Sequence, residues 1–172
     1  MAIEGMAIEI VTIGVYGFDA DQFFQALVEQ RVDTLCDIRR RRGVRGAEYA
    51  FANKGRLQER LAALDIRYLH FLDLAPSTAL REQQAAADKQ AHTARRKRTA
   101  LNMQFVQGYE QEVLAHFDAA AFFAALGPEA HTVALLCVER QPEACHRSLL
   151  AEHLHKAFGI SVRHITPGAG GA

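Results

Sequence analysis

The sequence predicts a single α/β domain over residues 1–172. It is expected to be a mostly parallel five-stranded sheet flanked by helices, Rossmann-like or flavodoxin-like in kind. Short apolar and β-branched runs alternate along the chain with segments whose apolar residues recur at helical spacing. Strands joined through helices run parallel and are covered on both faces. A chain of 172 residues also has the size of one domain and can bury a core without disulfides.

Five segments carry the strand pattern. The first is a β-branched run that stops at Gly14, and the second stops at the polar turn Asp37-Ile38-Arg39. Continuous apolar runs of this length are typical of strands buried on both faces. The predicted strands cover residues 8–13, 32–38, 66–71, 132–138 and 160–165.

Helices are predicted in the intervals between these strands. Asp19, with Gln22 three residues later, is typical of a capped helix start. Pro142 favours the first position of a last helix that runs to Phe158, because the N–H that proline lacks would be unpaired there. The other predicted helices cover residues 54–64, 103–117 and 118–126.

Some segments have no clear period. Residues 39–53 are rich in Arg and Gly and are predicted to be a loop. Residues 79–98 are rich in Ala, Gln and Arg with few large apolar side chains, which fits either an exposed helix or a mobile insert. At the two ends, residues 1–7 and the Gly-rich residues 167–172 are expected to be flexible.

The composition limits the kinds of function. The chain has 20 basic and 20 acidic residues, so attraction to nucleic acid must come from a local basic surface. Three cysteines imply no disulfide framework and favour reduced thiols. No signal-peptide pattern is evident, and no apolar run approaches the roughly 20 residues needed to span a bilayer. We therefore expect a cytoplasmic protein with no membrane partner.

Reactive side chains gather where the predicted strands end. Asp37 and Arg39 lie at the end of the second strand, Cys137 and Glu139 lie at the end of the fourth, and Cys145 lies in the first turn or two of the last helix. In open parallel sheets, ligands bind beyond the carboxyl ends of the strands. The sequence therefore predicts a polar site at this edge. The predicted ligand-binding residues are Arg39, Arg147, His146, Tyr16, Cys137 and Ser148, and the predicted catalytic residues are Cys145, Glu139 and Asp37.

Each of these roles has a chemical reason and a structural alternative. A thiol at a helix N-terminus beside an Arg ionises more easily, so Cys145 could be a nucleophile, or else a small buried side chain. Glu139 could transfer protons or form a structural ion pair. Arg39 and Arg147 could hold a phosphate or carboxylate in bidentate fashion, whereas Asp37 and Arg39 could also stabilise their turn as a local pair.

The motifs of common cofactor and metal sites are missing from the sequence. It contains no P-loop, no GxGxxG opening a helix, no HExxH and no GxSxG, so the cofactor is left unknown. Cys137, Cys145 and His146 have a spacing that matches no standard zinc motif, and no metal is predicted. Two basic runs, Arg39–Arg45 and Arg95–Arg98, could contact a phosphate backbone or be solvated loops.

Four motifs of the sequence are Thr12-Ile13-Gly14, Asp37-Ile38-Arg39, the Leu61–His70 stretch, and Cys137-Val138-Glu139 with Cys145-His146-Arg147-Ser148. These motifs resemble those of the family known as domain of unknown function 488. The resemblance implies a compact α/β domain with a common pocket, and it supplies no reaction. Two turns depart from the family pattern, since Val15-Tyr16 follows Gly14 where His-Ser is frequent, and Ala75-Pro76 follows Leu74 where Gly-Gly is frequent.

Three hypotheses for the function follow, and the sequence leaves open whether the chain is an enzyme. The first is an enzyme for an anionic, phosphate- or nucleotide-like substrate, with Arg39 and Arg147 as anion ligands. The second is a binding module that uses the same pocket without catalysis. The third is a nucleic-acid-binding protein that uses the two Arg-rich runs.

Overall fold

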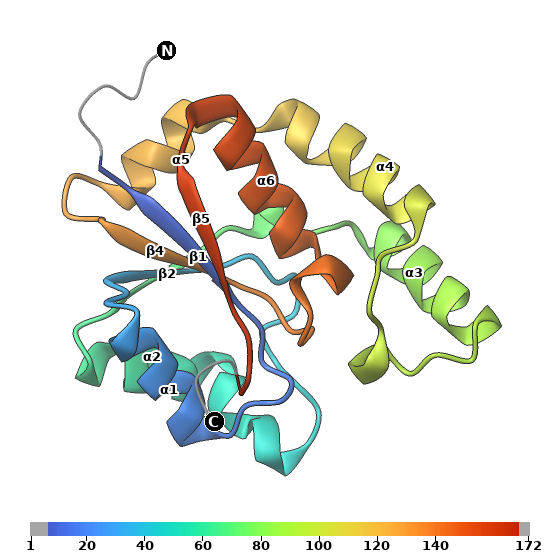
Figure 1. Cartoon of the computed structure of the whole chain (residues 1–172), viewed down its shortest axis with the longest axis horizontal. Helices are drawn as coiled ribbons and strands as arrows, with labels where there is room; N and C mark the ends of the chain where they lie inside the picture. The colour runs from blue at the N-terminus through green and yellow to red at the C-terminus, as the bar shows by residue number, and fades with distance from the viewer. Residues whose placement is uncertain (1–6, 169–172) are drawn as a thin grey trace.

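The predicted α/β class is confirmed. A computed structural model describes residues 7–168 and contains one five-stranded sheet in which all neighbouring strands are parallel (Figure 1). The strand order is β3-β2-β4-β1-β5, which differs from the usual Rossmann and flavodoxin orders. The strands are β1 (Glu9–Ile13), β2 (Thr34–Asp37), β3 (Arg67–His70), β4 (Thr132–Leu136) and β5 (Ser161–Ile165).

Helices cover both faces of the sheet. In Figure 1, α1 and α2 lie below the sheet, whereas α5 and α6 lie above it, with α4 and α3 packed beyond α6. No helix within residues 7–168 is long and apolar enough to cross a membrane. The helices of this part of the chain are α1 (Ala20–Glu29), α2 (Lys54–Ala63), α3 (Thr78–Gln90), α4 (Met103–Glu112), α5 (Ala119–Leu126) and α6 (His146–Phe158).

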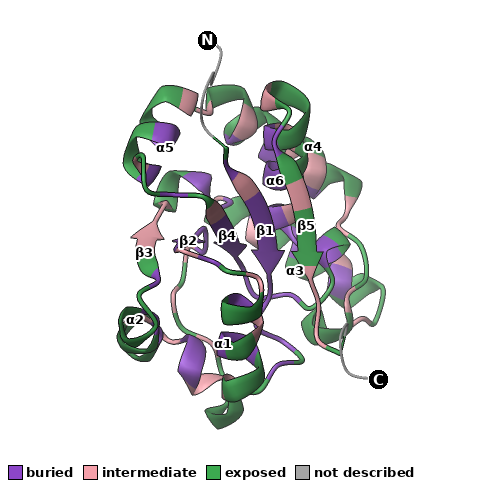
Figure 2. Cartoon of the chain, turned by 60° about the vertical axis from the view of Figure 1, so that its left-hand side comes forward, coloured by how far each residue is buried: buried purple, intermediate pink, exposed green. Residues whose placement is uncertain are grey.

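The core consists of two apolar clusters, one on each face of the sheet. Because side chains alternate along a strand, Val11 and Ile13 of β1 pack on the side of α1 and α2, and Ile10 packs on the side of α5 and α6. β1 and β4 are the central strands and are buried along most of their length, whereas β5 is largely exposed at the sheet edge (Figure 2).

The capped start of α1 is confirmed, because Asp19 and Gln22 form a reciprocal capping box. The prediction that Pro142 opens the last helix is wrong. Pro142–Ala144 forms a separate 3-10 turn, and Cys145 is extended (φ −140°, ψ 144°), so α6 begins at His146.

The two segments without a clear period also have structure. The predicted loop 39–53 contains a 3-10 helix, Ala47–Ala52. Most of the segment 79–98 is helical, because it is covered by α3, whose N-cap is Ser77. A 3-10 turn covers Arg95–Lys97. Of the ends expected to be flexible, residues 1–6 and 169–172 lie outside the described residues.

The topology opens a crevice between β2 and β4. The two strands are hydrogen-bonded neighbours, but β2 leads to α2 on one face and β4 leads to α6 on the other. The segments that follow these two strands therefore leave towards opposite faces, and this is the position where parallel sheets bind ligands. The Asp37–Arg39 turn and the Cys137–Glu139 segment meet at this point.

Candidate functional site

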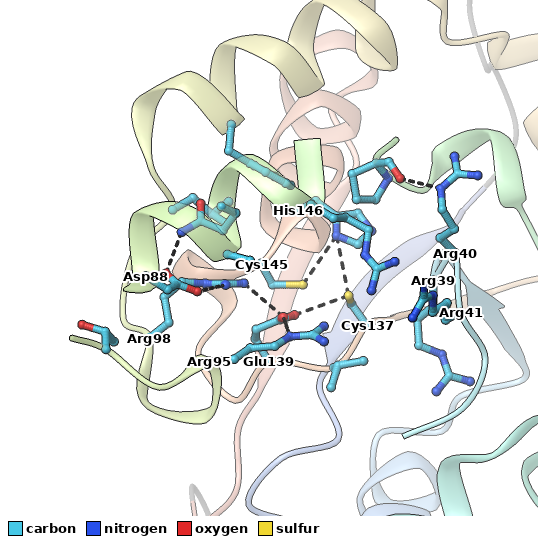
Figure 3. Close-up of a pocket in the computed structure, with 18 of the residues that line it drawn as sticks. Arg39, Arg40, Arg41, Asp88, Arg95, Arg98, Cys137, Glu139, Cys145 and His146 are labelled. Atoms are coloured by element: carbon cyan, nitrogen blue, oxygen red, sulfur yellow. Dashed lines mark hydrogen bonds and ion pairs between the residues drawn. The ribbon is translucent and has the colours of Figure 1, made fainter. Parts of the chain in front are cut away.

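A cavity of about 340 Å³ lies beyond the carboxyl ends of β2 and β4. Its residues come from the loop after β2, from α3 and the segment behind it, and from the connection between β4 and α6 (Figure 3). Seven basic side chains line it against two carboxylates. The basic residues are Arg39, Arg40, Arg41, Arg81, Lys89, Arg95 and Arg98, and the acidic residues are Asp88 and Glu139.

Asp37 and Arg39 form a buried pair at the end of β2. The Nε and Nη2 of Arg39 each donate to one carboxylate oxygen of Asp37 at 2.8 Å, and the hydroxyl of Tyr68 donates to the same carboxylate at 2.7 Å. The remaining nitrogen, Nη1 of Arg39, is buried and has no hydrogen-bond partner among the described residues. Arg39 lines the cavity, whereas Asp37 lies behind it and orients the guanidinium.

Tyr68 is expected to make the stability of the fold fall with pH in the alkaline range. Burial and its hydrogen bond to Asp37 raise the pKa of Tyr68 to about 12, above the ordinary value of 10. A raised pKa in the folded state stabilises the fold below pH 10, and this contribution is lost as the pH rises towards 12. The free energy of unfolding, measured in urea, should therefore fall more between pH 10 and 12 for the wild type than for Tyr68→Phe. Equal losses would contradict this role of Tyr68.

Two thiols surround the imidazole of His146 on the cavity floor. The Sγ of Cys137 lies 3.6 Å from Nδ1 of His146, and the Sγ of Cys145 lies 3.9 Å from the same nitrogen. The other ring nitrogen, Nε2, lies 2.9 Å from the carbonyl oxygen of Ile38. Because a carbonyl can only accept a hydrogen bond, Nε2 carries the proton and Nδ1 faces the sulfurs.

The two thiols are in different electrostatic states. Burial raises the pKa of the Cys137 thiol, and the neighbouring Cys145 raises it further. Burial also disfavours a thiolate at Cys145, but a hydrogen bond from Cys137 and the charges of His146 and Arg147 hold its pKa well below the usual range. The charge of Cys145 in turn raises the pKa of His146 against the effect of burial. Cys145 is therefore the thiol that ionises first.

The carboxylate of Glu139 is paired with two arginines that follow α3. Arg95 donates to its Oε1 at 2.8 Å and Arg98 donates at 3.0 Å. Arg98 also pairs with Asp88 at 2.7 Å and donates to the carbonyl of Ala144. These contacts fix residues 95–98 over the cavity, a segment that the sequence left undecided.

The basic run Arg95–Arg98 therefore divides in two. Arg95 and Arg98 face the cavity, whereas Arg96 stacks over the rings of Tyr16 and Tyr49, 5.3 and 5.1 Å from their centroids. Tyr16 is thus engaged on the outer side of the segment and does not line the cavity.

Arg147 is fully buried and lies outside the cavity. Its guanidinium donates to the Thr12 hydroxyl at 3.3 Å and to the carbonyls of Glu139 and Arg140 at 2.5 and 3.1 Å. These bonds connect the start of α6 to the ends of β1 and β4. Ser148 also lies outside the cavity, where its hydroxyl donates to the carbonyl of Cys145.

The contribution of α3 to the site was not predicted from the sequence. Arg81, Gln84 and Asp88 lie on one face of this helix and all line the cavity, and Gln84 and Asp88 are buried. A polar stripe at spacings of three and four residues was the available signal. Burial and the nearby charges of Arg95 and Arg41 lower the pKa of Arg81, which reflects the positive potential in this space.

Of the nine predicted site residues, five line the cavity: Arg39, Cys137, Glu139, Cys145 and His146. A family model described as domain of unknown function DUF488 matches residues 19–154 of the chain. No curated protein and no solved structure matches the chain.

Proposed function

For this chain, which belongs to the family described as domain of unknown function DUF488, we propose the binding of a small phosphate-bearing anion, such as a phosphate ester or nucleotide. The proposed site is the cavity at the ends of β2 and β4. The observation that carries the proposal is the excess of basic over acidic side chains around this cavity, seven against two.

The excess charge has no counterpart within the cavity. Glu139 is neutralised by Arg95 and Arg98, and Asp88 is paired with Arg98. Arg40, Arg41, Arg81 and Lys89 have no ion-pair partner among the described residues. Bringing like charges together is unfavourable, and an anion with several acceptor oxygens would offset the repulsion.

Arg39 provides a second line of support. Two of its nitrogens are held by Asp37, and the third, Nη1, is buried without a partner among the described residues. An unsatisfied buried donor is rare in native proteins and costs about 1–3 kcal/mol. A phosphate oxygen in the cavity would be a suitable acceptor for this pre-oriented guanidinium.

The size of the cavity favours a small molecule over a duplex. Its volume of about 340 Å³ falls at the lower end of the range of small-molecule sites, about 300–1,000 Å³.

Cys145 and Glu139 line this space and remain the candidates for a catalytic role, since both would face the bound anion. The free, buried cysteines support the proposal that the protein works in the reducing cytoplasm.

Binding of inorganic phosphate and of nucleoside monophosphates should be measurable by calorimetry and by thermal shift. We expect Arg81→Met to weaken phosphate affinity about 10-fold or more, because a charged contact contributes roughly 1.5–3 kcal/mol. Arg56→Met is the matched control, because it removes one positive charge from the exposed surface of α2. The proposal fails if the wild type binds no phosphate, or if both variants lose the same affinity.

Nucleic acid is the second candidate ligand, favoured by the exposed side chains of Arg41, Arg45 and Arg96 at the rim. A single-stranded oligonucleotide tests it in the same assay. Binding that falls steeply with salt and depends on Arg45 and Arg96 rather than on Arg81 would favour the phosphate backbone as the ligand.

A further inference from the structure

Three metal-ligating side chains converge on the floor of the cavity. The Sγ atoms of Cys137 and Cys145 and a ring nitrogen of His146 lie within 4.8 Å of one another, and all three residues are buried. Cys137 directly follows β4, whereas Cys145 and His146 form the N-cap and first residue of α6. The backbone of both elements is fixed by the sheet and the core, so the three donors are pre-positioned.

We propose that Cys137, Cys145 and His146 bind a zinc ion, or a similar thiophilic divalent cation, with three protein ligands. The proposal is independent of anion binding in the cavity. It also differs from the expectation based on sequence spacing, which matches no standard zinc motif.

The distances fit such an ion. Zinc lies about 2.3 Å from thiolate sulfur and about 2.0 Å from imidazole nitrogen in tetrahedral geometry, which separates a sulfur from a nitrogen by about 3.6 Å. The sulfurs of Cys137 and Cys145 lie 3.6 and 3.9 Å from Nδ1 of His146. Both sulfur–nitrogen distances are therefore within a few tenths of an ångström of the tetrahedral value.

The imidazole is oriented as metal-bound histidines are. A ligating histidine usually donates its other ring N–H to a carbonyl or carboxylate, which fixes the tautomer and the ring. His146 does so through Nε2 and the Ile38 carbonyl at 2.9 Å, which leaves the lone pair of Nδ1 between the two sulfurs. The ring of Tyr109 packs against the imidazole, with centroids 5.4 Å apart, and limits its rotation.

The fourth coordination position would open on the cavity, because all three ligand residues line it. Catalytic zinc sites have this arrangement, with three protein ligands and one position for water or substrate. Glu139 lies beside it, with Oε2 3.6 Å from the Sγ of Cys137 and Oε1 held by Arg95 and Arg98. A proton from a metal-bound water could pass to this carboxylate.

The test is zinc uptake by the reduced full-length chain. We expect one zinc per chain by elemental analysis, and X-ray absorption should give two sulfur neighbours at about 2.3 Å and nitrogen or oxygen neighbours near 2.0 Å. With cobalt in place of zinc, sulfur-to-cobalt charge-transfer bands and the visible spectrum of a tetrahedral site should appear. These measurements use the wild type and do not depend on how a variant folds.

Cysteine variants then identify the ligands. Cys137→Ser and Cys145→Ser should each weaken zinc affinity about 100-fold or more, since loss of an outer-shell partner alone costs 10–100-fold. Cys36→Ser is the matched control, because Cys36 is equally buried on β2 but lies outside the cluster. The site is refuted if the wild type takes up no zinc, if absorption data show no sulfur ligands, or if Cys36→Ser loses the same affinity.

The zinc and anion proposals can fail separately. Phosphate affinity is measured on the metal-free chain, and zinc affinity is measured without phosphate. Arg81→Met is expected to keep stoichiometric zinc while it loses phosphate affinity. Zinc uptake that disappears in Arg81→Met would contradict the assignment of zinc to the cysteine and histidine ligands.

Discussion

Replacing Arg147 with Met is expected to lower the free energy of unfolding by about 3–5 kcal/mol, because each hydrogen bond from a buried charged group contributes about 1.5–3 kcal/mol. The guanidinium of Arg147 is fully buried and is hydrogen-bonded to Thr12 and to the carbonyls of Glu139 and Arg140. Met fills much of the same volume but leaves the carbonyls of Glu139 and Arg140 without this donor, whereas the Thr12 hydroxyl keeps its hydrogen bond with His164. For a chain of this length the melting temperature should fall by about 6–20 °C.

The matched control is Arg163→Met on β5. Arg163 pairs with Glu9 at the surface with about half of its side chain exposed, so its loss should cost less than about 1 kcal/mol. Urea and thermal unfolding measure both variants. If Arg147→Met keeps wild-type stability but loses phosphate affinity, Arg147 is a ligand-binding residue and the structural role assigned to it is wrong.

Gly14→Ala is expected to destabilise the fold at least as much as Arg147→Met, lowering the free energy of unfolding by about 3 kcal/mol or more. A Cβ on Gly14 would lie 2.0 Å from the carbonyl oxygen of Glu139 and 3.0 Å from Nη1 of Arg147. Backbone atoms cannot rotate away as a flexible side chain can, so β1 and the Cys137–Glu139 segment would have to separate. Overpacking usually costs 1–3 kcal/mol and more where the neighbours cannot yield.

Gly55→Ala is the control for this substitution. A Cβ on Gly55, in α2, would meet no atom within 4 Å. Because Ala has the higher helix propensity, this variant should match the wild type or gain up to about 1 kcal/mol. Denaturant midpoints compare the two variants directly. Similar midpoints for both would contradict the close approach of β1 to Glu139.

The contact between Gly14 and the Glu139 carbonyl also links Gly14→Ala to anion binding in the cavity. The carbonyl of Glu139 is held between Gly14 and Arg147, while its side chain faces the cavity and pairs with Arg95 and Arg98. A displaced Glu139 would release both arginines from their present positions. We therefore expect phosphate affinity to fall together with stability in any Gly14→Ala protein that still folds.

Local patterns in the sequence determined the elements of the fold. The alternation of apolar runs and helical spacing predicted all five strands, and the pair Asp19 and Gln22 predicted the start of α1, because both signals act over a few residues. The same reasoning placed Cys137, Glu139 and Cys145 near the carboxyl edge of the sheet, since strand ends and helix starts are local features. The Pro142 signal was misleading, because Cys145 is extended and interrupts the helix.

The tertiary structure alone decided which of the charged and reactive side chains meet. Arg147 was predicted to bind an anion and Arg95 was assigned to a basic run, yet the fold buries Arg147 against backbone carbonyls and pairs Arg95 with Glu139. The strand order made neighbours of β2 and β4 and thereby brought the Arg39 turn to the cluster that follows β4. Cys137 and His146 are nine residues apart, and only the bend between β4 and α6 brings their donor atoms to 3.6 Å. The partners of a charge or a thiol are set by contacts between distant segments, and no local pattern carries that information.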